Sequence, residues 1–477
     1  MVTRRRFLSR LAAAGAALPF SGGATAAASF VRPLPAAVLR QGAVPAPVWR
    51  GESALSMGLA QGTIGIRDPA RAPGSVPTDA VAVPRVDLQA LGVELRRKYT
   101  DLRRHFLFEY YPWYATNPWR HWNHPDRQPP EGIATTSMPK LGPYDSRDLV
   151  VVEQHARWIT QSGAGGINIS WWGPGSYEDR AVHRIMDVMR DHDLRVTFHL
   201  EPFRQNRAVT YVDDILYLLR EYGEKRRWDA FLLLTDASGT TGPVFKSFRT
   251  IVPERVQDCR GNTQLVADYV PDAMWRNQTD RLHTTLRDDF DRVTLLADVS
   301  DIGRMQAAGF DGMAIYDNFV LPHTWRKLAE DNSSRDLLFS FNVNPGFDNV
   351  PTPPPPSPEP NPDPCYSPPP TEPGSHLDWL TEAFREQLAE RSRSRISEAF
   401  RTTLALQTDP AHANARHGFL LVYINSFNEW HEGHEFEPMK DFAELTPEER
   451  QYDYRNPRAG DYRLRHLQSL MRPVVAG

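Results

Sequence analysis

Residues 166–175 read Gly-Ile-Asn-Ile-Ser-Trp-Trp-Gly-Pro-Gly, an apolar run that ends at two adjacent tryptophans and a Gly-Pro-Gly turn. The run Gly166–Ser170 predicts a strand buried on both faces, as the strands of a parallel sheet are. The glycines and the proline then stop the strand and form a rigid loop. We use this unit, a buried strand that stops at an aromatic cluster, to predict the rest of the fold.

The same unit recurs on both sides of this stretch, with helical segments between the strands. Amphipathic periodicity predicts helices at Arg147–Ser162, Arg180–His192 and Asp213–Tyr222. Val293–Ala297 is a ninth candidate strand beyond a main set of eight. The eight are Phe106–Tyr111, Gly166–Ser170, Val196–Leu200, Phe231–Leu234, Leu265–Tyr269, Met313–Tyr316, Leu338–Phe341 and Leu420–Asn425.

The alternation of strands and helices predicts an α/β protein. Eight strands predict a single (β/α)8 TIM barrel with long loops at its C-terminal face. A doubly wound open sheet is the competing architecture. No Gly-x-Gly-x-x-Gly motif follows a candidate strand, which disfavours the dinucleotide-binding form of that sheet.

Polar and aromatic clusters come directly after five of the candidate strands. In a barrel the carboxyl ends of all strands open onto one face, so we expect the clusters to converge on one pocket. The clusters are Tyr110–Tyr114, Trp171–Gly175, Glu201–Phe203, Tyr316–Asn318 and Asn428–Gly433.

Glu429 and Glu432 are the candidate catalytic residues, in a cluster that reads Asn-Glu-Trp-His-Glu-Gly from residue 428. A pair of carboxylates, one protonated and one ionised, is the minimum equipment for hydrolysing a glycosidic bond. Mutual repulsion and apolar neighbours such as Trp430 separate two such pKa values. Solvated acids on a surface loop are the alternative, but burying this polar run without a function is costly.

Aromatic residues in the clusters are candidates for sugar binding, because sugar rings have apolar faces that pack on aromatic rings. Trp171 and Trp172 are adjacent, so strand alternation directs one toward the pocket and the other away from it. Glu201 is a candidate for binding sugar hydroxyls, or for an ion pair with Arg204 or Arg207. The candidate substrate-binding residues are Tyr110, Tyr111, Trp171, Trp172, Glu201, Tyr316, Asn428, Trp430 and His431.

Several other chemistries are disfavoured by the sequence. The run His431–His434 lacks the His-Glu-x-x-His spacing of a zinc site, so we predict no metal and no cofactor. No Gly-x-Ser-x-Gly elbow is present, which disfavours a serine esterase. Lys plus Arg is 55 and Asp plus Glu is 59, a net charge of -4, so a nucleic acid is not the expected partner.

The N-terminus has the ordered regions of a bacterial export signal. Thr3–Leu8 fits the twin-arginine pattern, a short apolar run follows, and Ala24–Ala26 is a small-x-small cleavage site. We expect residues 1–26 to be this signal. The apolar run is too short to span a membrane, so we predict no stable membrane insertion after its removal. The expected location is the periplasm, the cell surface or the medium.

The remaining chain divides into an arm and one large domain. Residues 27–87 are rich in proline and alanine and predict a linker or surface arm. Residues 88–477 would form the barrel domain, with a proline-rich insertion at 351–373. Whether Cys259 and Cys365 pair in an oxidising compartment is left open.

The clusters, in this order, resemble glycoside hydrolase family 99, the endo-α-1,2-mannosidases and endo-α-1,2-mannanases. The resemblance spans about residues 105–440, with a poorly matching segment at 228–300. The matching stretches are Tyr110–Tyr114, Trp119–His124, Gly142–Ser146, Ser170–Gly173, Phe198–Pro202, Gly309–Gly312, Asn344–Asp348, Ser426–Gly433 and Glu437–Pro438.

The resemblance implies the barrel and an endo-acting, retaining enzyme for mannan-like glycans that uses no enzyme nucleophile. Glu429 would be the base on the sugar's own 2-hydroxyl, giving a 1,2-anhydro intermediate. Glu432 would be the general acid and then the base for water. Trp172 would contact the next sugar, as in the mannan-directed bacterial type, while Glu201 and Tyr316 would line the cleaved sugar's subsite. The open alternatives are a hydrolase of another cell-envelope polysaccharide and a non-catalytic carbohydrate-binding barrel.

Overall fold

The computed structural model describes residues 86–476 except for short gaps and one long one. The gaps are 124–126, 131, 204–206, 226, 258–261, 267, 300, 319, 348–380 and 453. The predicted export signal, nearly all of the predicted arm, the proline-rich insertion and both cysteines lie outside the described residues.

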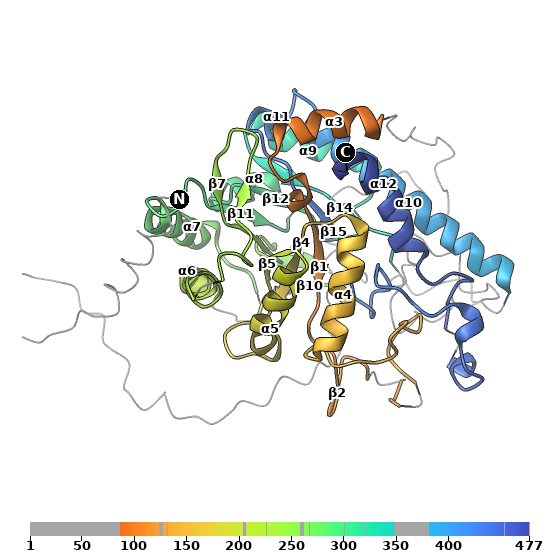
Figure 1. Ribbon diagram of the computed structural model, residues 1–477. Coiled ribbons are helices and arrows are strands. Elements are labelled where there is room, and N and C mark those ends of the chain that lie inside the picture. The colour runs from red at the N-terminus through yellow and green to blue at the C-terminus, as the bar shows by residue number, and fades with distance from the viewer. Residues whose placement is uncertain are drawn as a thin grey trace, which may run out of the picture.

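One sheet of parallel strands forms the centre of the molecule, with helices outside it (Figure 1). Strands that neighbour one another in sequence order also neighbour one another in the sheet, as in a (β/α)8 barrel. The strands are β1 (Phe106–Tyr110), β4 (Gly166–Trp171), β5 (Arg195–Leu200), β8 (Val244–Ser247), β11 (Thr294–Ala297), β12 (Gly312–Ala314), β13 (Leu338–Ser340), β14 (Asn342–Val343) and β15 (Val422–Ile424).

The barrel closes through one strand that is split in two. β13 pairs with β12, whereas β14 pairs with β15, and Phe341 alone separates β13 from β14. β15 pairs in turn with β1, which completes the circle. Counted with β13 and β14 as one, the sheet has eight strands. This closure confirms the predicted barrel and excludes the doubly wound open sheet.

Two predicted strands were wrong, and one barrel strand was not predicted. Phe231 makes a single bridge to Val196, and the next place in the sheet is taken by β8. Leu265 ends an exposed antiparallel hairpin outside the barrel. β8 reads Val-Phe-Lys-Ser, too short and too polar to stand out as a buried strand. The ninth candidate, Val293–Ala297, is confirmed as β11.

Short antiparallel hairpins lie outside the central parallel sheet. They are β2 (Ala115–Thr116) with β3 (Trp119–Arg120), β6 (Leu234–Thr235) with β7 (Thr241–Gly242), and β9 (Arg255–Gln257) with β10 (Thr263–Leu265).

The three predicted helices are present with shifted ends. They correspond to α4 (Leu149–Ser162), α5 (Tyr177–Asp191) and α6 (Arg207–Leu218). Ser176 caps α5 by accepting the Asp179 amide at 3.0 Å, so the helix begins immediately after the Trp171–Gly175 cluster. The other helices are α3 (Leu88–Lys98), α7 (Asp272–Leu286), α8 (Ile302–Ala307), α9 (Trp325–Ser334), α10 (Glu382–Thr408), α11 (Ala413–Arg416) and α12 (Tyr462–Val475).

The two ends of the described chain meet on one side of the barrel, where α3 packs on α12 (Figure 1). The Arg96 guanidinium donates to the carbonyls of Pro473 and Val474 at 3.0 and 2.7 Å. Among the described helices, none has the length and apolar character needed to cross a membrane.

Candidate active site

Glu429 lies in the loop that follows β15, at the carboxyl end of the barrel. Its side chain is buried, and only 3% of the residue is exposed. Its backbone N–H donates to the Ser426 hydroxyl at 2.8 Å, and its Oε1 accepts the His431 amide at 3.0 Å. Burial, followed by the charge of Glu432, raises the pKa of Glu429 well above its usual range.

Glu432 lies in the same loop but reaches water, with 28% of its side chain exposed. Its Oε2 accepts the Tyr316 hydroxyl at 2.9 Å and lies 2.7 Å from Nε2 of His434. His434 is itself fully buried. The two glutamates therefore differ in environment, as two carboxylates with different roles must.

Tyr316, which follows β12, is fixed at both of its backbone groups. Its N–H donates to Asp298 at 2.8 Å. Its carbonyl accepts from Nδ2 of Asn342 and Asn425, at 2.5 and 3.0 Å. Its position opposite Glu432 is therefore set by residues from three further strand ends.

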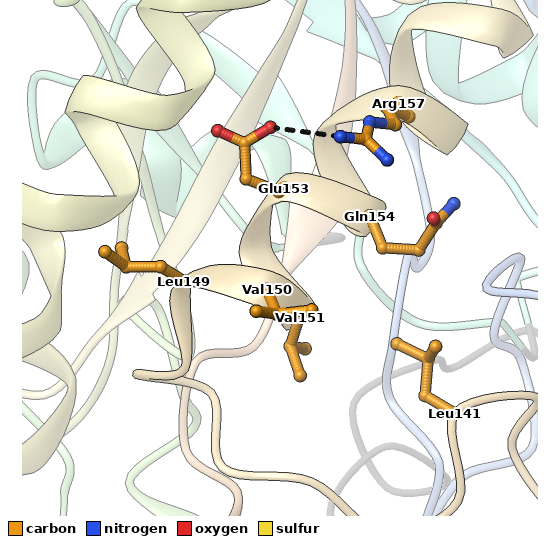
Figure 2. A pocket seen from close by; sticks show the side chains of 7 residues that line it. All are labelled: Leu141, Leu149, Val150, Val151, Glu153, Gln154 and Arg157. Carbon is orange, nitrogen blue, oxygen red and sulfur yellow. Dashed lines mark ion pairs between the residues drawn. The ribbon is translucent and has the colours of Figure 1, made fainter.

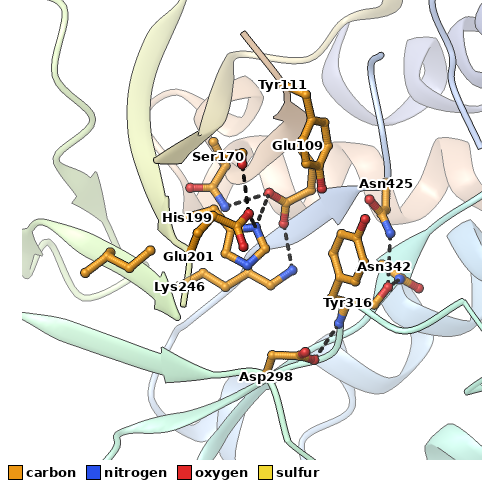
Figure 3. Close-up of polar contacts among 12 residues, drawn as sticks. Glu109, Tyr111, Ser170, His199, Glu201, Lys246, Asp298, Tyr316, Asn342 and Asn425 are labelled. Atoms are coloured by element: carbon orange, nitrogen blue, oxygen red, sulfur yellow. Dashed lines mark hydrogen bonds and ion pairs between the residues drawn. The ribbon is translucent and has the colours of Figure 1, made fainter. Parts of the chain in front are cut away.

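A buried network of charged side chains lies among the strands of the barrel, where Glu109, His199 and Lys246 approach one another (Figure 3). Glu109 of β1 accepts from Lys246 of β8 at 2.6 Å, and its other oxygen lies 3.2 Å from Nδ1 of His199. Burial alone would raise the pKa of Glu109, but the adjacent Lys246 and His199 lower it to about 2. The Lys246 ammonium also lies 5.3 Å from the centre of the Tyr316 ring.

Glu201 and Trp172 are joined through Ser170. The Ser170 hydroxyl donates to Glu201 at 2.8 Å and accepts the Trp172 indole N–H at 3.1 Å. Burial raises the pKa of Glu201. Glu201 does not form the ion pair with Arg207 that was the alternative to sugar binding. Arg207 donates instead to backbone carbonyls such as that of Phe248 at 2.7 Å. Arg204 lies outside the described residues.

Asn428 and Trp430 shape the glutamate loop from beneath. Asn428 exchanges two hydrogen bonds with the backbone of Tyr111, at 2.8 and 3.0 Å. The Trp430 indole donates to Glu437 at 2.9 Å. Both side chains are completely buried, so they hold the loop in place without an open face for a ligand. The His431 ring contacts the backbone carbonyl of His121.

Two candidate residues lie away from the glutamates. Trp171 is fully buried in the layer between strands and helices, where its indole donates to Asp179 at 2.8 Å. Tyr110 is also fully buried, with its hydroxyl 3.0 Å from Nδ1 of His155. The expected alternation is thus observed: Trp171 points toward the helices, whereas Trp172 packs with Trp113, ring centres 6.4 Å apart, in the cluster that also contains Tyr316 and Trp430.

The sequence prediction missed the buried network. Glu109, His199 and Lys246 are charged or titratable residues inside short apolar strands. A strand buried on both faces excludes such side chains unless they pair inside the barrel. A charged residue within an apolar strand was therefore the sequence feature that could have revealed the network. Glu437, which accepts from the Trp430 indole and from the Tyr144 hydroxyl, lies in the loop after β15 and entered the sequence analysis only within the matching stretch Glu437–Pro438.

A separate apolar depression lies at the start of α4 (Figure 2). Its volume is about 330 Å³, and Leu141, Leu149 and Val150 contribute aliphatic surface to it. A long ion pair, 3.9 Å between Arg157 and Glu153, borders it. It contains neither Glu429 nor Glu432, so it is not the candidate active site. Within the described ranges, no three His, Cys, Asp or Glu side chains are grouped to hold a metal.

The chain is similar to known proteins in both sequence and fold. The family model described as glycosyl hydrolase family 99 matches residues 101–232. The glycoprotein endo-alpha-1,2-mannosidase-like protein of Mus musculus is 25% identical over 415 residues, covering 79% of this chain and 76% of the relative. Glycoprotein endo-alpha-1,2-mannosidase of Xenopus laevis is 24% identical over 368 residues, covering 69% and 68%.

The fold has solved counterparts as well. The GH99 endo-alpha-mannosidase structure from Bacteroides thetaiotaomicron superposes with a TM-score of 0.53 at 18% sequence identity, covering 78% of this chain and 99% of that one. A complex of that enzyme with Bis-Tris propane gives a TM-score of 0.50 at 19% identity, with 77% and 96% covered.

With this barrel and these relatives, the protein is a glycoside hydrolase. More narrowly, the chain is similar to glycosyl hydrolase family 99, whose model matches residues 101–232, and to endo-alpha-1,2-mannosidase relatives at 24–25% identity.

Proposed function

We propose that this protein is an exported, retaining endo-α-glycosidase that cleaves α-1,2-mannosidic bonds in mannan-like glycans. The substrate class is suggested by its relatives, two of which carry the name endo-alpha-1,2-mannosidase. One observation carries the proposal for the site: Glu429 and Glu432 share a loop at the carboxyl end of the barrel, one buried and the other open to water.

The proposed reaction has two steps. Glu429 takes the proton of the substrate's 2-hydroxyl, the 2-oxygen bonds to the anomeric carbon, and the glycosidic bond breaks. Glu432 gives its proton to the leaving oxygen. In the second step Glu432 takes a proton from water and the water oxygen bonds to the anomeric carbon, while the bond between that carbon and the 2-oxygen breaks. Glu429 returns the proton to the 2-oxygen, so two successive displacements at the anomeric carbon retain the configuration.

The environments of the two glutamates support this division of roles. Glu432 is open to water, as the group that activates water must be, and Tyr316 orients its carboxyl. Glu429 is dry, and a carboxylate in a dry site is a stronger base once it is ionised. Its raised pKa means that the free enzyme holds a proton on Glu429 over part of the acidic range, so Glu429 must lose it before the first step.

The proposed location follows from the N-terminal sequence. The twin-arginine pattern in Thr3–Leu8 and the cleavage site Ala24–Ala26 direct export. Fusing residues 1–30 to a reporter enzyme would test this: we expect export, and we expect none after replacement of Arg4 and Arg5 by Lys. A reporter retained in the cytoplasm by the native sequence would contradict the proposal.

A product assay tests the activity. The protein from about residue 27 is incubated with α-1,2-branched mannan and with defined manno-oligosaccharides, and mass spectrometry reads the released sugars. We expect oligosaccharides from the parent and at least a roughly 10²-fold slower release from Glu429→Gln and from Glu432→Gln, because each removes a proton-transfer group.

The matched control is Glu94→Gln, since Glu94 is an exposed glutamate of α3 that pairs with the exposed Lys98. It should release products at the parent's rate. A folded parent that releases nothing from mannan would contradict the substrate. Full activity in both loop variants would contradict the site.

A further inference from the structure

A third glutamate, Glu437, contacts the glutamate loop, residues 426–434. Its side chain is fully buried. Its Oε2 accepts the Tyr144 hydroxyl at 2.7 Å and the Trp430 indole N–H at 2.9 Å. An indole N–H can only donate, so the carboxyl of Glu437 is the acceptor of that hydrogen bond. The proposed reaction gives this carboxyl no proton to transfer, and its role must be sought in what it holds.

His155 of α4 binds the other oxygen of the same carboxyl. Its Nε2 lies 3.1 Å from Oε1 of Glu437, and both side chains are fully buried. Its Nδ1 lies 3.0 Å from the Tyr110 hydroxyl. An imidazole that accepts the Tyr110 O–H at Nδ1 carries its proton on Nε2, which donates to Glu437. With that assignment both ring nitrogens are satisfied, and α4 is joined by buried hydrogen bonds to the segment that follows β15.

The contacts of Glu437 reach both chain neighbours of Glu429. Trp430 directly follows Glu429, and its indole is bound by Glu437 itself. Asn428 directly precedes Glu429 and donates to the Tyr144 hydroxyl at 3.3 Å, while that hydroxyl donates to Glu437. A displacement of Glu437 would therefore release the chain on both sides of the proposed base.

We propose that Glu437 and His155 are positioning residues, which hold Glu429 in place through its two neighbours in the chain. The inference deepens the proposed function and, for its effect on the rate, rests on it. Hydrogen bonds to a carboxylate are shorter and stronger than those between neutral groups, so they suit a fixed anchor. Both side chains are buried, so they act on the reaction through the loop rather than by touching the glycan.

Two variants test the anchor. Glu437→Leu removes every acceptor of the carboxyl, whereas Tyr144→Phe removes one hydroxyl and no charge, and it decides the question if the first variant does not fold. The control is Glu221→Leu, which loses a carboxylate bound to a histidine, His183 at 2.9 Å, on the outer helices. Near-ultraviolet circular dichroism shows which variants are folded.

Hydrogen exchange measures the anchor without any substrate. Mass spectrometry follows the peptides that cover residues 426–434 and, for comparison, those of β4. We expect the loop to exchange about fivefold faster in Tyr144→Phe, as loss of one hydrogen bond allows, and faster still in Glu437→Leu. Exchange of β4 should not change, and the control should match the parent in both regions.

Kinetics on a neutral manno-oligosaccharide measure the consequence for catalysis. A shift of about 1 Å at a proton-transfer group costs about 10²-fold in rate, so kcat of Glu437→Leu should fall by about that factor. KM should stay within about twofold, because neither residue touches the glycan. For Tyr144→Phe we expect kcat about fivefold lower, the equivalent of one hydrogen bond.

The pH profile of Tyr144→Phe separates positioning from a loss of folded enzyme. A loosened loop admits water to Glu429, so the acidic limb of kcat/KM should move to lower pH. A smaller folded fraction would lower every point equally and leave the limb in place. The variant keeps all the acidic and phenolic groups that interact electrostatically with Glu429, namely Glu432, Glu201, Tyr111, Tyr114 and Tyr316.

Loop exchange at the parent's rate in the folded variants would overturn the anchor. Faster exchange with the parent's kcat and an unmoved acidic limb would overturn the positioning role and leave a pair that only stabilises the fold. Faster loop exchange in the variants, together with a parent that cleaves no mannan, would sustain the anchor and overturn the proposed hydrolysis.

Discussion

Glu429 and Glu432 show how far two identical side chains diverge over three positions. The amide of His431 and the hydroxyl of Ser426 tie Glu429 into the buried side of the loop. The hydroxyl of Tyr316 meets Glu432 on the open side. Burial, rather than residue type, is the main cause of the raised pKa of Glu429.

The pH dependence of activity follows from the raised pKa of Glu429. A base must be ionised, so kcat/KM should rise with pH through the pKa of Glu429 in the free enzyme. We expect the acidic limb above pH 4.5, the ordinary value for glutamate, because burial and Glu432 both oppose ionisation. A pH–rate profile on a neutral manno-oligosaccharide measures it. A limb at or below pH 4.5 would remove Glu429 from the role of base.

The residual activity of Glu432→Gln tests whether Glu432 contributes to the raised pKa of Glu429. Removing the Glu432 charge removes one cause of the raised pKa of Glu429, so the acidic limb of this variant should move to lower pH. An unmoved limb would show that the two carboxyls do not interact.

The adjacent tryptophans give a matched pair of substitutions. Trp171→Ala empties a fully buried site and should lower the free energy of unfolding by about 3–5 kcal/mol. Trp172→Ala should cost less stability but raise KM about tenfold, through loss of a stacking surface. Denaturant unfolding and steady-state kinetics separate the two effects. Equal KM changes in two folded variants would contradict the assignment of Trp172 to the pocket.

At the scale of the elements, the arrangement of the strands depends on buried ion pairs as well as on apolar packing. β1, β5 and β8 each carry one polar group into the barrel: Glu109, His199 and Lys246. An ionised side chain in a parallel strand is tolerated only when neighbouring strands supply its partner. The network therefore depends on the correct order of strands, and Tyr316 above it is positioned by the same order.

Glu109→Gln tests this dependence. At pH 7 it should lower the free energy of unfolding by about 3–5 kcal/mol, because Lys246 stays buried without its partner. The folded pKa of about 2 lies below the ordinary 4.5, so the stabilisation is complete above pH 4.5 and lost as pH falls toward 2. The deficit of the variant should shrink across that window. Urea unfolding at several pH values measures it.

Two results would bear against the network. A deficit that stays constant from pH 7 to pH 3 would show that Glu109 is not held ionised. A deficit no larger than that of Glu94→Gln, whose ion pair is exposed, would show that the buried pair adds little.

At the scale of the whole molecule, the first and last helices of the described chain pack against each other. Helix α3 begins the described domain and α12 ends it, and they touch at Gly92. A side chain at Gly92 would run into the backbone of Pro473 and Val474 and into the Arg96 guanidinium that binds it. The packing of these helices therefore requires glycine at this position.

Gly92→Ala should lower the free energy of unfolding by about 1–3 kcal/mol, through overpacking against backbone that cannot move freely. Gly303→Ala is the control, because Gly303 lies in α8 and its Cβ would meet only Asp301 at an ordinary 3.6 Å. We expect the control to be neutral or slightly stabilising. Thermal unfolding compares the two. Equal stability of both variants would mean that α3 and α12 pack less closely than described.

The sequence predicted those parts of the fold and site that depend on local patterns. Long apolar strands such as Gly166–Ser170 and Val196–Leu200 were confirmed, whereas the catalytic role of Glu429 and Glu432 stays a prediction. The short polar strand β8 was missed, and Leu265–Tyr269 was misjudged, because four or five residues carry too little periodicity to separate a barrel strand from an exposed hairpin. The prediction that Tyr110 and Trp171 bind substrate stays a prediction; in the structure their hydroxyl and indole groups contact His155 and Asp179.

The sequence by itself determined the class of fold, the long apolar strands, and the placing of Glu429 and Glu432 in one loop. These follow from hydrophobic periodicity and from residues adjacent in the chain. Only the tertiary structure decided that β13 and β14 close the barrel, that Glu109 meets Lys246, and that His155 meets Glu437. Such contacts join residues that are far apart in the chain, 137 positions for Glu109 and Lys246, and burial and charge at those sites depend on what the rest of the chain places there.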